Sequence, residues 1–176
     1  THIAVQCLRD PDRSVDYVVA LIQDITKRKQ AEEALQASEL FVNGVLNSLT
    51  AHIAVLDENG VIISVNEAWK KFATDNNSPD PDCYVGVNYL TVCETAVLSG
   101  EKSAEALLRG MKAVLAGSQA QFIDEYPCDA PDTPRWFTVT VLPQNQPLKG
   151  LIVVHQDITE RKQAEEKLRE SEEKFR

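Results

Sequence analysis

Runs of β-branched and other apolar residues lie at the two ends of the segment between residues 50 and 159. The first run, HIAVLDENGVIISVN at 52–66, surrounds an Asn-Gly pair, which is a strong signal for a β-hairpin. Three further runs, at 119–128, 135–143 and 148–158, are separated by stretches rich in Pro, Asp, Asn and Gln. The pattern predicts two strands, a central segment and then three strands.

The central segment has helical spacing instead. Asn66 is placed to cap a short helix at 67–76, and residues 86–98 form a second apolar stretch of helical character. Residues 103–117 place their apolar positions on one face, with Gly117 as the stop signal. Strands at both ends with helices between them predict an α+β fold, in which an antiparallel sheet carries helices on one face.

A stretch of eleven residues occurs twice with a single difference, as QDITKRKQAEE at 23–33 and as QDITERKQAEE at 156–166. A repeat at so long an offset indicates two units of one design. We expect the first copy to end a domain whose body precedes it. The expected divisions are a C-terminal hairpin of a preceding domain (1–26), a linking helix (27–49), a complete domain (50–159) and an outgoing helix (160–176).

Each copy of the repeat joins a strand to a helix. Asp157 is expected to cap the outgoing helix, with Glu160 as the reciprocal half of a capping box. The helices show a narrow apolar seam at 4-3-4 spacing flanked by charges, which favours a short coiled coil between two copies of the chain over a merely solvated helix. The seam positions are Leu35, Val42, Leu168 and Phe175.

The net charge, the length of the apolar runs and the cysteine pattern limit the classes of partner that we expect. The 176 residues have a net charge of −9, which repels nucleic acid and anionic membranes, so we expect neither nucleic-acid binding nor direct membrane insertion. The apolar runs are shorter than the roughly 20 residues of a bilayer helix. Four cysteines without a CxxC pair favour a reducing cytoplasm and predict no metal site.

Enzyme motifs are missing from the sequence. It contains no P-loop, GxSxG, HExxH or GxGxxG pattern, which predicts a module without catalysis of its own. The acidic cluster of Asp124, Glu125, Asp129 and Asp132 could attract a cation, but the pattern favours a solvated loop.

Three stretches carry a family resemblance: AVLDENGVIISVNEAW at 54–69, RWFTVTVLP at 135–143 and GLIVVHQDITERKQAEEKLRESEEKFR at 150–176. They resemble the PAS family of sensor modules, of the type found in tandem arrays in bacterial histidine kinases and cyclic-dinucleotide enzymes. The resemblance implies a five-stranded antiparallel sheet flanked by N- and C-terminal signalling helices. It also implies a signal-relay junction at Asp157, Ile158 and Thr159, with an upstream copy at Asp24, Ile25 and Thr26.

The resemblance allows known cofactor types to be tested. Tyr89 stands where the reactive cysteine of a LOV-type flavin photosensor would lie, and the helix at 103–117 offers no histidine to haem. A haem and a flavin adduct are therefore both disfavoured, and the cofactor, if there is one, is left unknown.

One histidine is placed where an apolar residue is expected. His155 shares a strand face with Leu151 and Val153, and Ile22 occupies the equivalent position of the upstream copy, which indicates a buried face. The ring could hydrogen-bond a small ligand, or it could be satisfied by Tyr89, Tyr126 or a backbone carbonyl. Trp69 could likewise line a cavity or belong to the plain core. The ligand-binding candidates are His155, Trp69, Tyr89 and Val153.

The sequence as a whole predicts a cytoplasmic sensory and dimerising module. We expect a homodimer that relays a signal, in response to a small molecule or a neighbouring PAS domain, to an effector such as a histidine kinase or diguanylate cyclase. The alternatives are a structural spacer that binds nothing, and a haem or flavin sensor.

Overall fold

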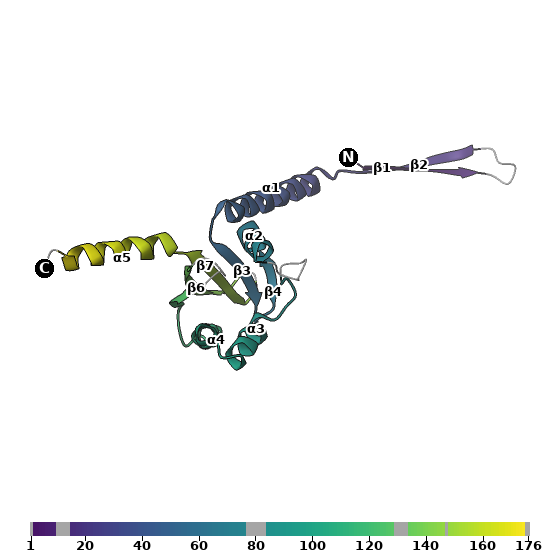
Figure 1. Ribbon diagram of the computed structural model, residues 1–176. Coiled ribbons are helices and arrows are strands. Elements are labelled where there is room, and N and C mark those ends of the chain that lie inside the picture. The colour runs from purple at the N-terminus through teal and green to yellow at the C-terminus, as the bar shows by residue number, and fades with distance from the viewer. Residues whose placement is uncertain (1, 10–14, 77–83, 129–133, 147, 175–176) are drawn as a thin grey trace. The chain divides into compact units, whose positions relative to one another are not determined.

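The computed structural model describes residues 2–9, 15–76, 84–128, 134–146 and 148–174 (Figure 1). Contacts divide the chain into two units, Thr1–Val45 and Leu46–Arg176. In the first unit, strand β1 (His2–Arg9) pairs antiparallel with β2 (Val15–Gln23), and helix α1 (Thr26–Ser48) begins three residues after β2 ends.

The second unit contains a five-stranded antiparallel sheet in the order β4-β3-β7-β6-β5, with β4 and β5 at its two edges. The strands are β3 (His52–Asp57), β4 (Ile62–Val65), β5 (Phe122–Pro127), β6 (Trp136–Gln144) and β7 (Gly150–Asp157). The helices are α2 (Glu67–Asp75), α3 (Tyr89–Leu98), α4 (Lys102–Leu115) and α5 (Thr159–Lys174).

The hairpin predicted around Asn59 and Gly60 is the turn between β3 and β4. Gly60 has a φ of +83°, a conformation that side-chain-bearing residues rarely adopt. The Asp57 carboxylate accepts hydrogen bonds from the Asn59 and Val61 amides, both at 2.9 Å, and so holds the turn together.

Asn66 links this hairpin to the first helix. Its side-chain oxygen accepts from the Trp69 amide at 3.0 Å, which is the predicted N-cap, and from the Ile53 amide of β3 at 2.9 Å. The Asn66 side-chain amide donates to the carbonyls of Ala51 and Leu46, so this buried polar residue is satisfied on all sides. The cap therefore fixes both the start of α2 and its position against β3.

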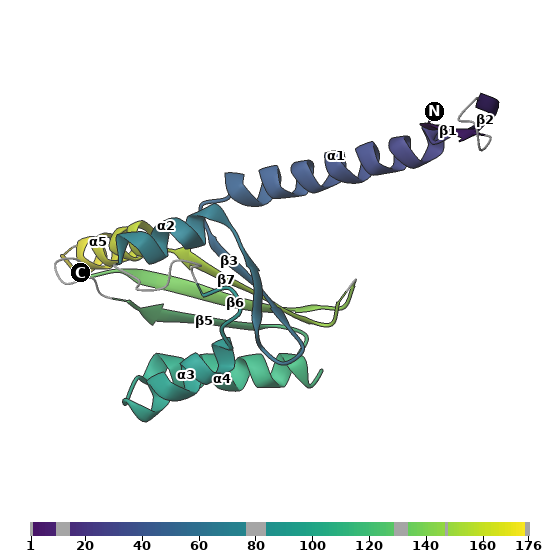
Figure 2. The same ribbon diagram turned by 90° about the vertical axis from the view of Figure 1, so that its right-hand side faces the viewer.

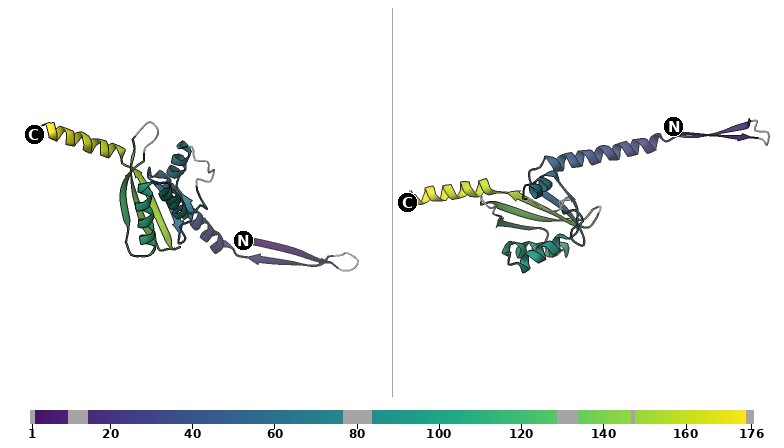
Figure 3. Two further views of the ribbon diagram at one scale, coloured as in Figure 1. Left: turned by 60° about the horizontal axis from the view of Figure 1, so that its bottom comes forward. Right: turned by 45° about the vertical axis from the view of Figure 1, so that its right-hand side comes forward.

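Helices cover one face of the sheet, as the α+β prediction requires. Helix α4 contacts β5, β6 and β7, and α3 packs beside α4 (Figures 2 and 3). Helix α4 ends at Leu115, and Gly117, two residues later, has a φ of +72°, which confirms the predicted stop. The largest fully buried side chains between these layers are Leu56, Ile62, Met111, Val139, Val141, Leu151 and Val153.

Candidate functional site

A cavity of about 210 Å³ lies between the inner face of the sheet and helices α2 and α3. Its described lining comes from four strands of the five-stranded sheet, β3, β5, β6 and β7, together with the two helices and the segments that follow α2 and β5. The lining residues are His52, Trp69, Phe72, Ala73, Asn76, Tyr84, Tyr89, Tyr126, Cys128, Phe137 and His155.

His155 lies at the centre of the polar groups in this cavity. The Tyr126 hydroxyl is 2.7 Å from its Nδ1, and the Tyr89 hydroxyl is 3.2 Å from its Nε2. We call these three side chains the Tyr-His-Tyr triad. The alternation along β7 that predicted a buried His155 is confirmed, because Leu151 and Val153 are fully buried on the same face and His155 is only 7% exposed.

Burial fixes the charge state of the triad. It lowers the pKa of His155 from 6.5 to about 4, with a further contribution from His52, so the imidazole is neutral at pH 7. Burial also raises the pKa of both Tyr89 and Tyr126, so both hydroxyls keep their protons. The triad is therefore an uncharged set of donors and acceptors in a cavity lined mainly by aromatic side chains, with His52 and Asn76 as further polar groups.

The other two predicted ligand-binding residues differ in position. The Trp69 ring centroid lies 5.8 Å from His155 and 5.9 Å from Tyr89, so Trp69 is part of the cavity wall. Val153 is fully buried in the core and lines neither this cavity nor the second one described below.

A second cavity, of about 180 Å³, lies on the other side of the triad, toward α3 and α4. Tyr89, Tyr126 and His155 line both cavities, so the triad is their shared wall. The second cavity also contains the carboxylate of Asp124, whereas no described residue of the first cavity is acidic or basic apart from its two histidines.

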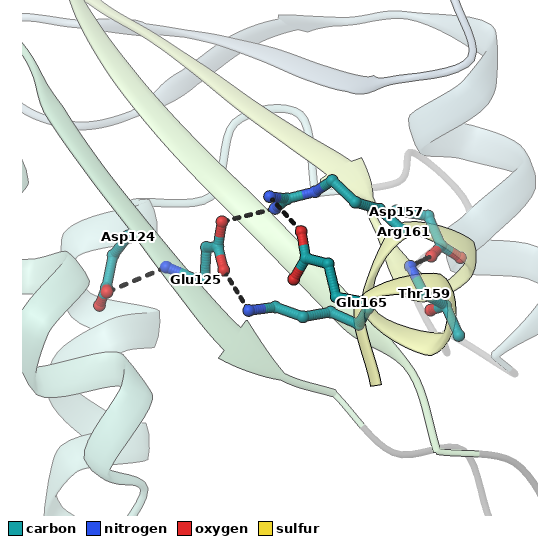
Figure 4. A network of polar contacts seen from close by, with 7 residues as sticks. Asp124, Glu125, Asp157, Thr159, Arg161 and Glu165 are labelled. Carbon is teal, nitrogen blue, oxygen red and sulfur yellow. Dashed lines mark hydrogen bonds and ion pairs between the residues drawn. The ribbon is translucent and has the colours of Figure 1, made fainter. Parts of the chain in front are cut away.

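The predicted relay junction follows directly after β7. Asp157 accepts a hydrogen bond from the Thr159 amide at 2.8 Å, so it caps the entrance of α5 through Thr159 and not, as the capping-box prediction had it, through Glu160 (Figure 4). Ile158 between them is buried. Its amide donates to the Trp136 carbonyl at 2.8 Å, and the Trp136 amide donates to the Thr159 hydroxyl at 3.0 Å. The junction is thus bonded at two points to the start of β6.

The first turn of α5 is also bonded to β5. The Glu125 carboxylate forms ion pairs with Arg161 at 2.5 Å and with Lys162 at 2.6 Å (Figure 4). The bonds from Lys162 and Arg161 lower the pKa of Glu125, because they stabilise its charged form. Lys162 also lies 5.1 Å above the Trp136 ring.

Sequence reasoning missed this role of Glu125 and placed it in a solvated acidic loop. Of that cluster, Asp129 and Asp132 lie outside the described residues. The Arg-Lys pair at 161 and 162 recurs as Arg28 and Lys29 after the first Asp-Ile-Thr, but nearly the whole stretch recurs, so the pair alone does not indicate an acidic partner on a strand. Arg28 pairs with Glu32 of its own helix at 2.7 Å.

The upstream copy of the junction shows the same cap. Thr26 donates to the Asp24 carboxylate from its amide at 2.9 Å and from its hydroxyl at 2.6 Å. Ile25, the middle residue of that copy, is half-buried.

The predicted dimer seam lies on solvent-facing helix surfaces. Leu35 and Leu168 are each 62% exposed and Val42 is 50% exposed, while Phe175 lies outside the described residues. The pairing of these helices between two chains stays a prediction. None of the helices in the described part of the chain is long and apolar enough to cross a membrane.

Comparison with known proteins bears on the fold. A family model described as the PAS fold matches residues 46–163. An uncharacterized 104.1 kDa protein of Rhodobacter capsulatus is 38% identical over 164 residues, which cover 90% of this chain and 16% of that protein's length. The PAS domain of Bordetella pertussis BvgS superimposes with a TM-score of 0.51 at 19% identity, covering 82% of this chain and 99% of that one. The phage VqmA-DPO complex superimposes with a TM-score of 0.51 at 20% identity, covering 78% of this chain and 61% of that one.

Proposed function

This chain belongs to the PAS family, and we propose that residues 50–159 sense a change in the central cavity and pass it through the Asp157–Thr159 junction to the outgoing helix. In this proposal the module dimerises, has no catalysis of its own, and acts on an effector such as a histidine kinase or diguanylate cyclase. Residues 1–26 then end a preceding PAS domain, and residues 27–49 bring its signal in.

A pair of neighbouring residues on β5 carries the proposal. Tyr126 points inward to His155, and Glu125 bonds to Arg161 and Lys162 of α5. Successive side chains of a strand point to opposite faces, so a displacement of Tyr126 toward or away from His155 also displaces Glu125. The cavity and the first turn of α5 are therefore linked through a single strand.

Strand β7 supplies a second link. His155 is two residues before Asp157, which caps α5, and Ile158 is bonded to Trp136. A rearrangement of the triad acts on α5 through both strands at once. Any ligand must bind the two arrangements with different affinity to drive such a change.

The alternative of a ligand-free spacer predicts a closely packed apolar interior. The cavity of about 210 Å³ and the polar triad that lines it favour a sensor over that alternative. The exposed apolar positions Leu35, Val42 and Leu168 support helix pairing between two chains as the route by which the signal leaves the module.

Amide hydrogen exchange of a His155→Ile variant tests the relay. Ile is the residue of the upstream copy, and it removes both bonds to the tyrosine hydroxyls without shortening the strand. If the cavity and α5 are coupled, amides of residues 158–162 exchange faster than in the parent chain.

The matched control is Ile62→Val, which removes one buried methylene from β4 at the opposite edge of the sheet. It is expected to leave the exchange of residues 158–162 unchanged relative to the rest of the sheet. Equal behaviour of the two variants at α5 would refute the relay, since it would mean that the triad has no particular connection to the junction.

A further inference from the structure

We propose that the cavity of about 210 Å³ takes an uncharged, ring-sized aromatic molecule that carries a hydrogen-bond acceptor, and that one tyrosine hydroxyl of the Tyr-His-Tyr triad donates to this acceptor. The inference rests on the proposed role of the cavity as the sensing site and names the chemical class of its ligand.

The first step is a count of hydrogens in the triad. A neutral imidazole has one N–H donor and one acceptor nitrogen, and each tyrosine hydroxyl brings one hydrogen, which makes three in all. The two contacts, Tyr126 with Nδ1 and Tyr89 with Nε2, use two of them. The tyrosine that accepts from the imidazole N–H must therefore direct its own O–H elsewhere.

The remaining hydrogen has no acceptor within the described part of the chain. Apart from His155, the hydroxyls of Tyr89 and Tyr126 have no hydrogen-bond partner among the described residues. Both tyrosines are half-buried and border the cavity, so a hydroxyl without a protein acceptor there loses part of its hydration, which is costly. A molecule in the cavity that offers an acceptor would satisfy this donor. His155 then acts as a positioning residue, because it determines which hydroxyl is available.

The size and lining of the cavity define the rest of the molecule. A cavity of about 150 Å³ accommodates benzene, so about 210 Å³ accommodates a substituted single ring. Aromatic rings dominate the wall: Trp69, Phe72, Tyr84, Tyr89, Tyr126 and Phe137 all line it.

Charge is the third criterion. Apart from its two histidines, no described lining residue is acidic or basic, and burial lowers the pKa of both His52 and His155, so each ring is neutral at pH 7. Arg135 is not among the lining residues; its Nη2 donates to Asn76 at 2.9 Å and its guanidinium lies 5.5 Å from the Phe72 ring centroid, while its buried Nε has no partner among the described residues. A charged ligand would lose its hydration without gaining an ionic partner from the described lining.

Three small probes of similar shape separate these criteria. Acetophenone carries a ring and a carbonyl acceptor, ethylbenzene lacks the acceptor, and benzoate is charged. Isothermal titration calorimetry on the whole chain at pH 7 gives the dissociation constants. We expect acetophenone to bind about 10-fold more tightly than ethylbenzene, which corresponds to one net hydrogen bond, and benzoate to bind more weakly than either.

Variants identify the donor. In either Tyr89→Phe or Tyr126→Phe, whichever tyrosine presents its hydroxyl, the ratio between acetophenone and ethylbenzene should fall to about 1. Phe72→Leu is the matched control, because it changes the apolar wall and should weaken both probes while leaving their ratio unchanged. Thermal melting of each variant verifies folding, and the comparison of probes in the parent chain does not depend on the variants.

The outcomes separate this inference from the proposed function. Equal binding of acetophenone and ethylbenzene by the parent chain overturns the acceptor, and tighter binding of benzoate overturns the uncharged class. A ratio that survives both tyrosine variants overturns the hydroxyl as its donor. No binding of any probe overturns the ligand class altogether. The relay is tested without a ligand, by exchange at residues 158–162, and none of these results decides it.

Discussion

Thr159→Val isolates the contact that joins the first turn of α5 to β6. The substitution keeps the β-branched shape and removes only the hydroxyl that accepts from the Trp136 amide at 3.0 Å. One such bond contributes roughly 0.5–1.5 kcal/mol, and the half-buried position of Trp136 lets water replace part of it. We therefore expect the free energy of unfolding to fall by about 1 kcal/mol.

Urea denaturation measures the overall loss, and amide exchange measures the local one. A change of about 1 kcal/mol should make the Trp136 amide exchange about 5-fold faster. Thr26→Val is the matched control in the same chain, because among the described residues the Thr26 hydroxyl bonds to exposed Asp24 alone, and its loss should change stability by less than about 0.5 kcal/mol. If both variants behave alike in both measurements, the Thr159 hydroxyl does not hold the junction and the reasoning is refuted.

Three more predictions follow from the same features. Asp157→Ala should lower helicity and amide protection in α5, because it removes a cap that contributes about 0.5–2 kcal/mol. Asp24→Ala should leave α5 unaffected. Equal circular dichroism and equal amide exchange in α5 for the two variants would contradict this prediction. Leu168→Glu should weaken self-association by placing a charge in the exposed seam, and an unaltered sedimentation profile would contradict the coiled coil. Stability should fall as the pH drops from about 6.5 to about 4, because the buried His155 stays neutral while the unfolded chain takes up a proton; His155→Ile should show a shallower fall in urea denaturation over that range.

Local sequence patterns were sufficient to predict several turns and helix ends of the fold. The Asn-Gly turn at Gly60, the Asn66 cap and the Gly117 stop each depend on the conformation of a few adjacent residues, and all three are confirmed. The inward position of His155 followed from strand alternation and from Ile22 in the upstream copy.

The partners of these residues depend on which strands become neighbours. The sequence allows Tyr89, Tyr126 or a backbone carbonyl as partners of His155, and both tyrosine contacts are present. The choice among them depends on the strand order β5-β6-β7, which no local pattern specifies. Glu125 illustrates the same limit, because an exposed carboxylate in an acidic stretch has the same local pattern whether it faces water or the basic turn of a helix. Val153 shows the converse, since sharing a face with His155 placed it in the core and not on a cavity wall.

The edge position of β5 has a consequence for solubility. An edge strand with free amides is a template on which another chain can add a strand, and two amides of this edge are unavailable for that purpose. The Glu125 amide donates to the Asp124 side chain at 2.9 Å (Figure 4). Pro127, two residues on along the same edge, has no amide hydrogen. The β5 edge of this sheet is therefore a poor template for a strand from a neighbouring molecule, which lowers the risk of edge-to-edge aggregation at this side of the domain.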